Sequence, residues 1–271
     1  MLLGGFDGLH LGHRQLLLCA KKSGFPVGIM TIVGAKGAKN LFTFAERERI
    51  FKESGADFVF ELPFAEIKDL SAHDFIRLLQ KEFSPKIFVC GEDFRFGAGA
   101  KGNAETLKAM DTVRVEILPL VEKNGEKISS GTVKNHLTAG DVETANLLLG
   151  ERFFLLGEVV KDRQVGRTLG FPTANVLYPS DKFPLKKGVY ETEITVENDT
   201  YRGITNYGAR PTFDNDVVLT ESYLDGFSGD LYGKTIKIAF VRYLRDIRKF
   251  DSVDELKQQL TQDMGRVRNH D

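Results

Sequence analysis

The rhythm of apolar segments changes once along the chain, near Gly150, and this change restricts the possible folds most. Before it, segments of helical periodicity separate four short apolar runs, VGIMTIV, DFVFELP, KIFVCG and VRVEILPL. Near-continuous apolar strands that alternate with helices are typical of a parallel sheet buried on both faces. The first half is therefore predicted to be an α/β domain with right-handed crossovers.

Helix start and stop signals support this reading. Thr43 followed by Glu46 forms a capping-box pattern, and Gly55 is predicted to end that helix. Ser71 opens SAHDFIRLLQ, whose apolar residues fall on one helical face. At the very start, MLLGGF is predicted to be the first strand and GHRQLLLCAKK the helix that follows its loop.

After Gly150 five strand-like segments follow with no helix between them: FFLLGEVV, GVYETEITV, TYRGITNYG, VVLTESYL and KTIKIAFVRYL. Asn198-Asp199 is predicted to be a hairpin turn. This pattern favours a small antiparallel barrel or sandwich, closed by a final helix that Ser252 caps. We therefore expect two domains, residues 1–152 and residues 153–271.

Composition excludes several classes of protein. The 271 residues carry a net charge of -1, without the basic excess typical of nucleic-acid binders. No apolar run approaches the roughly 18 residues of a membrane-spanning helix, and the start does not resemble a signal peptide. The two cysteines, Cys19 and Cys90, lie in apolar segments, which favours reduced thiols. We expect a cytoplasmic protein with neither nucleic-acid nor membrane partners.

The segment GGFDGLHLGH places His10 and His13 three positions apart, beside a predicted helix start. Glycines let the backbone approach a ligand, and a helix N-terminus presents free N–H groups to an anion. Phosphate binding is therefore one interpretation, and a pair of solvated loop histidines is another. Metal binding is weaker, because the remaining histidines are scattered and zinc needs three or four ligands.

A second polar motif, GRTLGFPTANV, begins at Gly166. Thr173 and Asn175 lie two positions apart, so an extended backbone would place both side chains on one face. Their oxygens suit magnesium, which takes phosphates as further partners. The alternative is an ordinary turn whose polar side chains have no functional role.

Several motifs, in order, resemble those of bacterial bifunctional riboflavin kinase/FMN adenylyltransferases (FAD synthetases). They are GGFDGLHLGH, CGEDFRFGAGAKGN at 90–103, KISSGTVKNHLTAGDVETANLLLG at 127–150, PTAN, NYGARPTF, LTESYLDGFSGDLYGK and RYLRDIRKFDSVDEL. The resemblance implies a Rossmann-like α/β nucleotidyltransferase domain followed by an antiparallel β-barrel riboflavin kinase domain with a C-terminal helix. It implies phosphorylation of riboflavin to FMN by ATP and Mg²⁺, then adenylation of FMN to FAD with release of pyrophosphate. The expected partners are these small molecules.

In the first domain the resemblance assigns His10 and His13 to the ATP phosphates and the transition state. Asp93 would lie near the substrates and Phe96 would stack on the flavin. The alternative without a functional role is that Asp93 caps a turn and Phe96 is a core side chain. Further nucleotide-binding candidates are Gly5, Phe6, Asp7, Ser129, Ser130 and Lys134.

This domain also departs from the family pattern. Gly131 replaces a hydroxyl residue, Lys134 replaces an arginine, and VGAKGAKN replaces a segment with proline and histidine. Lysine keeps the charge but lacks a planar two-pronged fork for phosphate. The alternative function is therefore a riboflavin kinase whose N-terminal domain is weakened or inactive but still binds ligand.

In the second domain Glu221 occupies the position of the family's catalytic glutamate. A carboxylate suits that position, since the ribityl 5′-hydroxyl must lose a proton as it attacks the γ-phosphate. The resemblance assigns Thr173 and Asn175 to the metal and to Mg-ATP. Gly166 and Gly170 would bind nucleotide, and Arg210 and Arg245 would bind flavin. The alternative without a functional role is that Glu221 is a surface residue and that the two arginines form exposed ion pairs.

Overall fold

The computed structural model describes the chain except residues 35–38, 111–112, 124, 162–172, 210–217 and 271. It divides into two compact units. The first comprises Met1–Thr132 and Leu148–Gly150, and the second comprises Val133–Leu147 and Glu151–Asp271. The predicted boundary after residue 152 stays a prediction, because the two units alternate along the chain between residues 132 and 151.

The first unit is built on a parallel sheet, as predicted. Strand β1 (Gly28–Val33) pairs in parallel with β2 (Phe58–Pro63), and β3 (Ile87–Gly91) pairs in parallel with β6 (Arg114–Leu118). Leu2 bridges both pairs, through Ile29 of β1 and Val89 of β3. The chain start therefore lies in the centre of the sheet.

The strand predicted over MLLGGF is shorter than expected. Leu2 N donates to Gly28 O at 2.8 Å and Leu3 N donates to Val89 O at 2.9 Å, and the pairing ends there. Phe6 adopts a positive φ of 39°, which an extended strand does not accommodate. The backbone thus turns into a loop immediately after Leu3.

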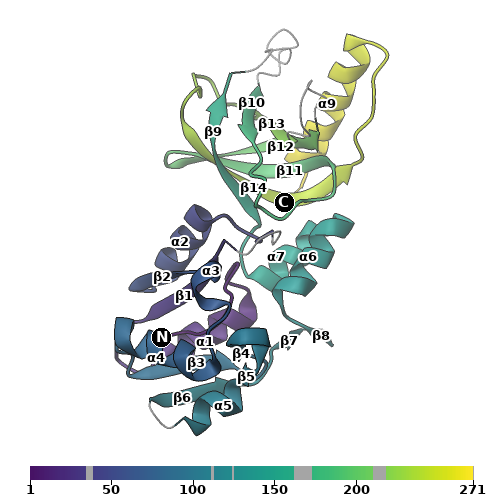
Figure 1. The fold of residues 1–271 in the computed structure, drawn as a ribbon. Coiled ribbons are helices and arrows are strands. Elements are labelled where there is room, and N and C mark those ends of the chain that lie inside the picture. The colour runs from purple at the N-terminus through teal and green to yellow at the C-terminus, as the bar shows by residue number, and fades with distance from the viewer. Residues whose placement is uncertain (35–38, 111–112, 124, 162–172, 210–217, 271) are drawn as a thin grey trace. The chain divides into compact units, whose positions relative to one another are not determined.

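The helices of this unit lie around the sheet (Figure 1). They are α1 (Leu11–Lys21), α2 (Phe44–Glu53), α3 (Phe64–Ile67), α4 (Ala72–Phe83), the 3₁₀ turn η1 (Ala98–Ala100) and α5 (Ala104–Ala109). Short strands are β4 (Arg95–Phe96), β5 (Gly102–Asn103), β7 (Glu122–Lys123) and β8 (Glu126–Lys127). The predicted capping box at the start of α2 is confirmed in both halves, since Thr43 and Glu46 each bond the other's backbone.

Two further helices, α6 (Ser130–Ala139) and α7 (Val142–Leu149), follow β8. The boundary between the two units falls within both of them. The predicted start of the second nucleotide motif, Ser129-Ser130, thus belongs to the first unit, whereas Lys134 belongs to the second.

The second unit contains a closed antiparallel barrel, in the strand order β10-β13-β12-β11-β14-β9 (Figure 1). Its strands are β9 (Phe154–Val160), β10 (Thr173–Leu177), β11 (Gly188–Val196), β12 (Asp199–Ala209), β13 (Val218–Leu224) and β14 (Thr235–Arg245). The barrel confirms the predicted fold class, but with a sixth strand, β10, that the sequence analysis did not count. Antiparallel pairing of β10 with β9 and β13 closes the barrel.

The hairpin between β11 and β12 corrects one prediction. Val196 pairs with Asp199, so the two turn residues are Glu197 and Asn198 rather than Asn198 and Asp199. Glu197 takes the positive φ, 55°, that such a tight turn requires.

The final helix, α9 (Val253–Arg268), packs on the barrel. Ser252 caps it by accepting from Glu255 N at 3.2 Å, as predicted. Met264 and Val267 of α9 form a buried cluster with Val189 of β11 and Ile204 of β12. This helix therefore covers the outer face of these two strands.

Candidate active sites

His10 is the N-cap of α1 and is 7% exposed. Its Nδ1 accepts a hydrogen bond from His13 N at 3.2 Å. A ring nitrogen that accepts carries no hydrogen, so neutral His10 must carry its hydrogen on Nε2. His10 can therefore offer an N–H donor to an anion without becoming charged.

His13 has the opposite arrangement. Its Nδ1 lies 2.9 Å from Gly8 O, and a carbonyl can only accept, so Nδ1 carries the hydrogen. The two imidazole rings stack with their centroids 3.6 Å apart. Nε2 of His13 gains a hydrogen only when the ring is protonated, which a bound phosphate would favour.

Burial keeps both histidines neutral in the free protein. Desolvation lowers the pKa of His10 to about 3, and the neighbouring His13 and Lys127 add to this effect. Desolvation also lowers the pKa of His13. Positive charge at this site must therefore come from other residues until a phosphate binds.

These lowered pKa values predict a pH-dependent stability. Below pH 6.5 the unfolded chain protonates His10 while the folded chain does not, so folding loses stability as pH falls from 6.5 towards 3. Each histidine that stays neutral costs about 1.4 kcal/mol per pH unit in that range. His10→Asn preserves an acceptor for the helix cap, so urea unfolding of this variant should lose less stability than the wild type between pH 7 and 5. An equal loss in both proteins would contradict the buried, neutral state of His10.

A cavity of about 280 Å³ adjoins the two histidines. It opens beyond Leu3, Ile32 and Gly91, which lie at the carboxyl ends of the parallel chain segments, the usual position of ligand sites in such sheets. Its lining includes the predicted site residues Gly5, His10, His13 and Asp93. The structure thus brings predicted site residues from two distant motifs of the sequence to one cavity.

Lys127 is a residue of this site that the sequence analysis missed. Its Nζ lies 2.7 Å from Asp93 Oδ2, and both side chains are about half exposed. This pair places a lysine beside the neutral histidines. Lys127 is the first residue of the motif quoted at 127–150, but the sequence analysis assigned it no role, because the pairing of its short strand, β8, cannot be seen there.

Phe6 and Asp7 shape the loop between these groups. The Phe6 ring is buried and lies 4.3 Å from the His13 ring, centroid to centroid. Its carbonyl accepts from Thr31 Oγ1 at 3.2 Å, and Asp7 accepts from the Ser130 hydroxyl. Both predicted nucleotide residues therefore hold the loop, and Asp7 ties it to the start of α6.

The second nucleotide motif begins α6. Ser129 Oγ accepts from Thr132 N at 3.2 Å, as an N-cap does. Gly131 follows at an exposed position, where an added Cβ would meet only Ser129 Oγ, at 3.6 Å. Lys134 Nζ lies 5.5 Å from the ring centroid of Phe183 within the second unit.

The flavin-stacking prediction for Phe96 fits the structure poorly. Phe96 is 5% exposed and belongs to the core of the first unit, with Phe75 and Leu107. Phe94, whose ring stacks on Phe96 at 5.3 Å, lines the cavity instead. The short strand pairing of β4 with β5 turns Phe96 inward, so Phe94 is the better candidate for contact with a flavin.

The second candidate site lies on the outer face of the barrel, on β10 and β13. Asn175 pairs directly with Glu221 across these strands, which places both side chains on one face. Thr173 Oγ1 donates to Glu221 Oε1 at 3.0 Å. The strand therefore gathers Thr173, Asn175 and Glu221, although 46 positions separate Asn175 from Glu221 in the sequence.

Asn175 also provides a test of the predicted magnesium site. Asn175 is 5% exposed, and its Oδ1 is buried without a hydrogen-bond partner among the described residues. A buried amide oxygen without a partner is costly, and a hard cation or its bound water would satisfy it. The residues present thus fit Mg²⁺, although the described part of the chain holds no cluster of three His, Cys, Asp or Glu side chains that could bind a metal.

Arg245, predicted to bind flavin, makes a buried ion pair. Its Nε donates to Asp263 Oδ2 at 2.9 Å, and Gln259 Nε2 donates to Asp263 Oδ1 at 2.8 Å. Asp263 is fully buried on α9. Arg245 therefore joins β14 to the final helix. Gly166, Gly170 and Arg210 lie outside the described residues.

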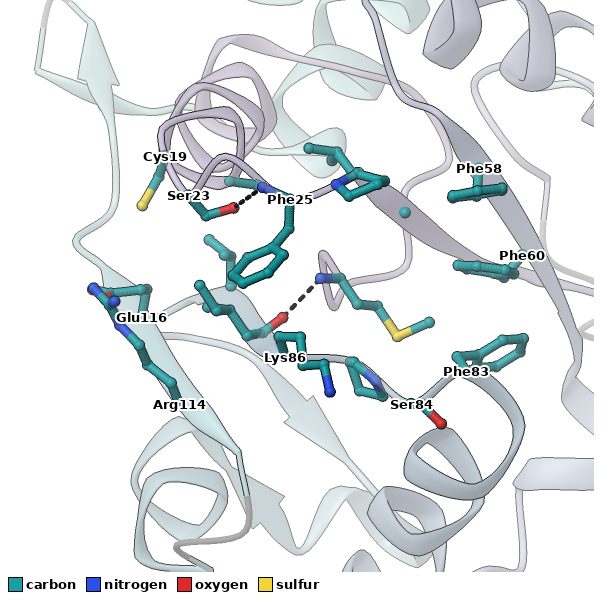
Figure 2. Close-up of a pocket in the computed structure, with 18 of the residues that line it drawn as sticks. Cys19, Ser23, Phe25, Phe58, Phe60, Phe83, Ser84, Lys86, Arg114 and Glu116 are labelled. Carbon is teal, nitrogen blue, oxygen red and sulfur yellow. Dashed lines mark hydrogen bonds and ion pairs between the residues drawn. The ribbon is translucent and has the colours of Figure 1, made fainter.

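A larger cavity, of about 760 Å³, lies at the opposite, amino ends of the parallel strands (Figure 2). Figure 2 shows Phe25, Phe58, Phe60 and Phe83 around it, together with Lys86 and Arg114. None of the predicted site residues lines this cavity.

The comparisons with known proteins match a different family to each part of the chain. The riboflavin kinase family matches residues 149–270, and the FAD synthetase family matches residues 1–132. A barrel and an α/β unit with these matches define a two-part transferase of flavin cofactor synthesis. Among the described residues, no helix is both long and apolar enough to span a membrane.

Relatives cover nearly the whole chain. The bifunctional riboflavin kinase/FMN adenylyltransferase of Buchnera aphidicola subsp. Acyrthosiphon pisum is 35% identical, over 97% of this chain and 90% of its own length. The proteins of the same name from Bacillus subtilis (33% identity; 97% and 89%) and Escherichia coli K12 (34%; 97% and 90%) match similarly. The chain therefore belongs to the bifunctional riboflavin kinase/FMN adenylyltransferase family, which confirms the predicted family and its two activities.

A solved structure supports the fold. A crystal structure from Streptococcus pneumoniae, described as a macrolide-efflux protein, matches with a TM-score of 0.90 and 34% identity. It covers 100% of this chain, and the match spans 93% of that chain. Because both family matches are present, no finding favours the alternative of an inactive N-terminal domain.

Proposed function

We propose that Glu221 is the general base of the riboflavin kinase reaction in the barrel unit. The observation that carries this assignment is the direct pairing of Glu221 with Asn175, whose unpartnered Oδ1 lies in the same row. Thr173 Oγ1 holds one Glu221 oxygen at 3.0 Å and thereby fixes the carboxylate. A base and a metal-binding oxygen thus lie side by side, as phosphoryl transfer to an alcohol requires.

The reaction follows from this arrangement. As the ribityl 5′-hydroxyl oxygen attacks the γ-phosphorus of ATP, its proton passes to the Glu221 carboxylate. The bond between the γ-phosphorus and the bridging oxygen breaks, and ADP leaves. Mg²⁺, held through Asn175 and Thr173, would neutralise phosphate charge. The barrel residues orient the alcohol and remove its proton.

In the first unit, His10 and His13 bind the ATP phosphates while the FMN phosphate attacks the α-phosphorus and pyrophosphate leaves. Support comes from the cavity that both histidines line, and from the Nε2 hydrogen that His10 keeps when neutral. Donors aimed at developing charge are the main contribution an enzyme makes to such a transfer. Asp93, Phe94 and Lys127 would lie on the flavin and phosphate side of this cavity.

The altered second motif gives a gain-of-function prediction. Space around Gly131 admits a side chain, and a threonine there would restore the hydroxyl that the family pattern has at this position. Gly131→Thr should raise the rate of FAD formation from FMN by roughly 3- to 10-fold, the effect of about one added hydrogen bond. Gly131→Ala, which adds a Cβ without a hydroxyl, serves as the control. An unchanged rate would mean that other residues already supply this contact.

A pyrophosphate-release assay tests the adenylation half directly. The purified chain receives FMN, ATP and magnesium, without riboflavin, and pyrophosphate is measured together with FAD. Equal amounts of both products support the assignment, whereas ATP consumption without FAD would contradict it.

We infer that the enzyme works in the cytoplasm, an inference supported by Cys19 and Cys90, which form no disulfide.

A further inference from the structure

The row of side chains through Glu221 extends one strand beyond the proposed metal side. Asn206 of β12 pairs directly with Glu221 of β13, as Asn175 of β10 does from the other side. Directly paired residues on neighbouring strands share one face. Asn175, Glu221 and Asn206 therefore form a continuous row on the outer face of the barrel.

Asn206 resembles Asn175 in one further respect. Its Oδ1 is buried, and no described residue donates a hydrogen bond to it. A native structure rarely leaves a buried acceptor unsatisfied, so such an atom points to a group that is bound during function. Two acceptors of this kind flank the proposed base.

One metal ion does not explain both amide oxygens. The strands that carry Asn175 and Asn206 are separated by β13, hence by two strand spacings, or about 9 to 10 Å. Glu221 of β13 lies between the two asparagines, so an ion bound through Asn175 and Thr173 lies on the β10 side of the carboxylate. We therefore assign Asn206, on the β12 side, to a different partner.

The surroundings of Asn206 indicate the chemistry of that partner. Ile247 is 46% exposed and lies directly over Gly208, which is two positions along β12 from Asn206. The next position of the row is Val189, which is apolar and packs against α9. Asn206 is therefore the last polar residue of the row on this side. The exposed apolar side chain of Ile247 lies close to it, over Gly208.

We propose that Asn206 binds the ribityl chain of the flavin substrate and so holds the reacting hydroxyl beside Glu221. A polyol joined to an apolar ring system matches an amide acceptor next to Ile247. The row then gives a direction to the site, with the phosphate donor on the β10 side of Glu221 and the accepting alcohol on the β12 side. This inference rests on the proposed kinase site.

The test compares two flavins that share a ring system. Riboflavin carries the ribityl chain, whereas lumiflavin carries a methyl group in its place. In calorimetric titrations of the full chain without ATP, Asn206→Ala should weaken riboflavin binding about 10-fold and leave lumiflavin binding unchanged. In the kinase assay the KM for riboflavin should rise about as much, while the KM for Mg-ATP stays the same.

Two controls separate this role from a structural one. Removing an unsatisfied acceptor should leave Tm unchanged or raise it, whereas loss of a structural hydrogen bond would lower it. Asn206→Ser, which keeps a hydroxyl, should lose less riboflavin affinity than Asn206→Ala. Asn198→Ala, at an exposed turn position of the same hairpin, should change neither flavin.

Equal weakening of both flavins, or no weakening of riboflavin, would overturn the role of Asn206. Either outcome would leave the assignment of Glu221 intact, because the binding assay does not depend on catalysis. Conversely, a failure of the Glu221 assignment would show in turnover alone. The two proposals therefore fail in distinguishable ways.

Discussion

Glu221→Gln is expected to reduce FMN formation from riboflavin by about 10²- to 10⁴-fold, the usual contribution of a general base. Glutamine has the same shape, and its amide oxygen can still accept from Thr173 Oγ1, so the barrel should fold normally. The amide lacks the basicity to take a proton from the ribityl hydroxyl. The loss should therefore appear in kcat, with little change in the KM for riboflavin.

The same variant should convert FMN to FAD at the wild-type rate, because that chemistry belongs to the other unit. Glu158→Gln provides a matched control, since Glu158 is an exposed glutamate on β9 of the same barrel. FMN formation is measured by chromatography of flavins. A wild-type rate in Glu221→Gln would show that another group removes the proton.

Replacing both His10 and His13 by alanine should have the converse effect. Loss of one preorganised donor at a charge-developing oxygen costs about 10²- to 10³-fold, so the double variant should form almost no FAD from FMN. Riboflavin phosphorylation should continue. The two activities are followed in one sample, each serving as the folding control for the other unit.

Single variants can separate the histidines' roles. His10→Asn keeps the acceptor for His13 N and so retains the cap of α1, but it removes the Nε2 donor. Its adenylation rate should fall strongly while its stability at pH 7 changes little. His73→Ala, at an exposed position of α4, should alter neither activity. Unchanged FAD formation in the double variant would make the histidines structural parts of the loop.

The sequence predicted the architecture well, because the spacing of apolar residues and the residues that begin and end helices act locally. Apolar runs alternating with capped helices predicted the parallel sheet, and Thr43 and Ser252 indeed cap their helices. The sixth barrel strand was missed because β10 is only five residues long and begins within the glycine-containing motif GRTLGFPTANV. Closure of the barrel depends on that strand, and closure is a property of pairing rather than of local sequence.

Site details that depend on long-range pairing could not be predicted. Phe94 and Phe96 lie in the same motif, and only the pairing of β4 with β5 determines which one is buried. Arg245 finds its partner, Asp263, 18 positions later in the sequence, within α9. The proposed role of Asn206 depends on the strand register that places it beside Glu221, and the sequence alone does not give that register.

Chromatography of flavins from the wild-type chain tests the central claim most directly. The purified protein is incubated with riboflavin, ATP and magnesium, and samples are taken over time. We expect riboflavin to give FMN first and FAD afterwards, with ADP and pyrophosphate as the matching products. Riboflavin that persists without FMN, or FMN that accumulates without FAD even when FMN is supplied directly, would contradict the assignment of two active sites to this chain.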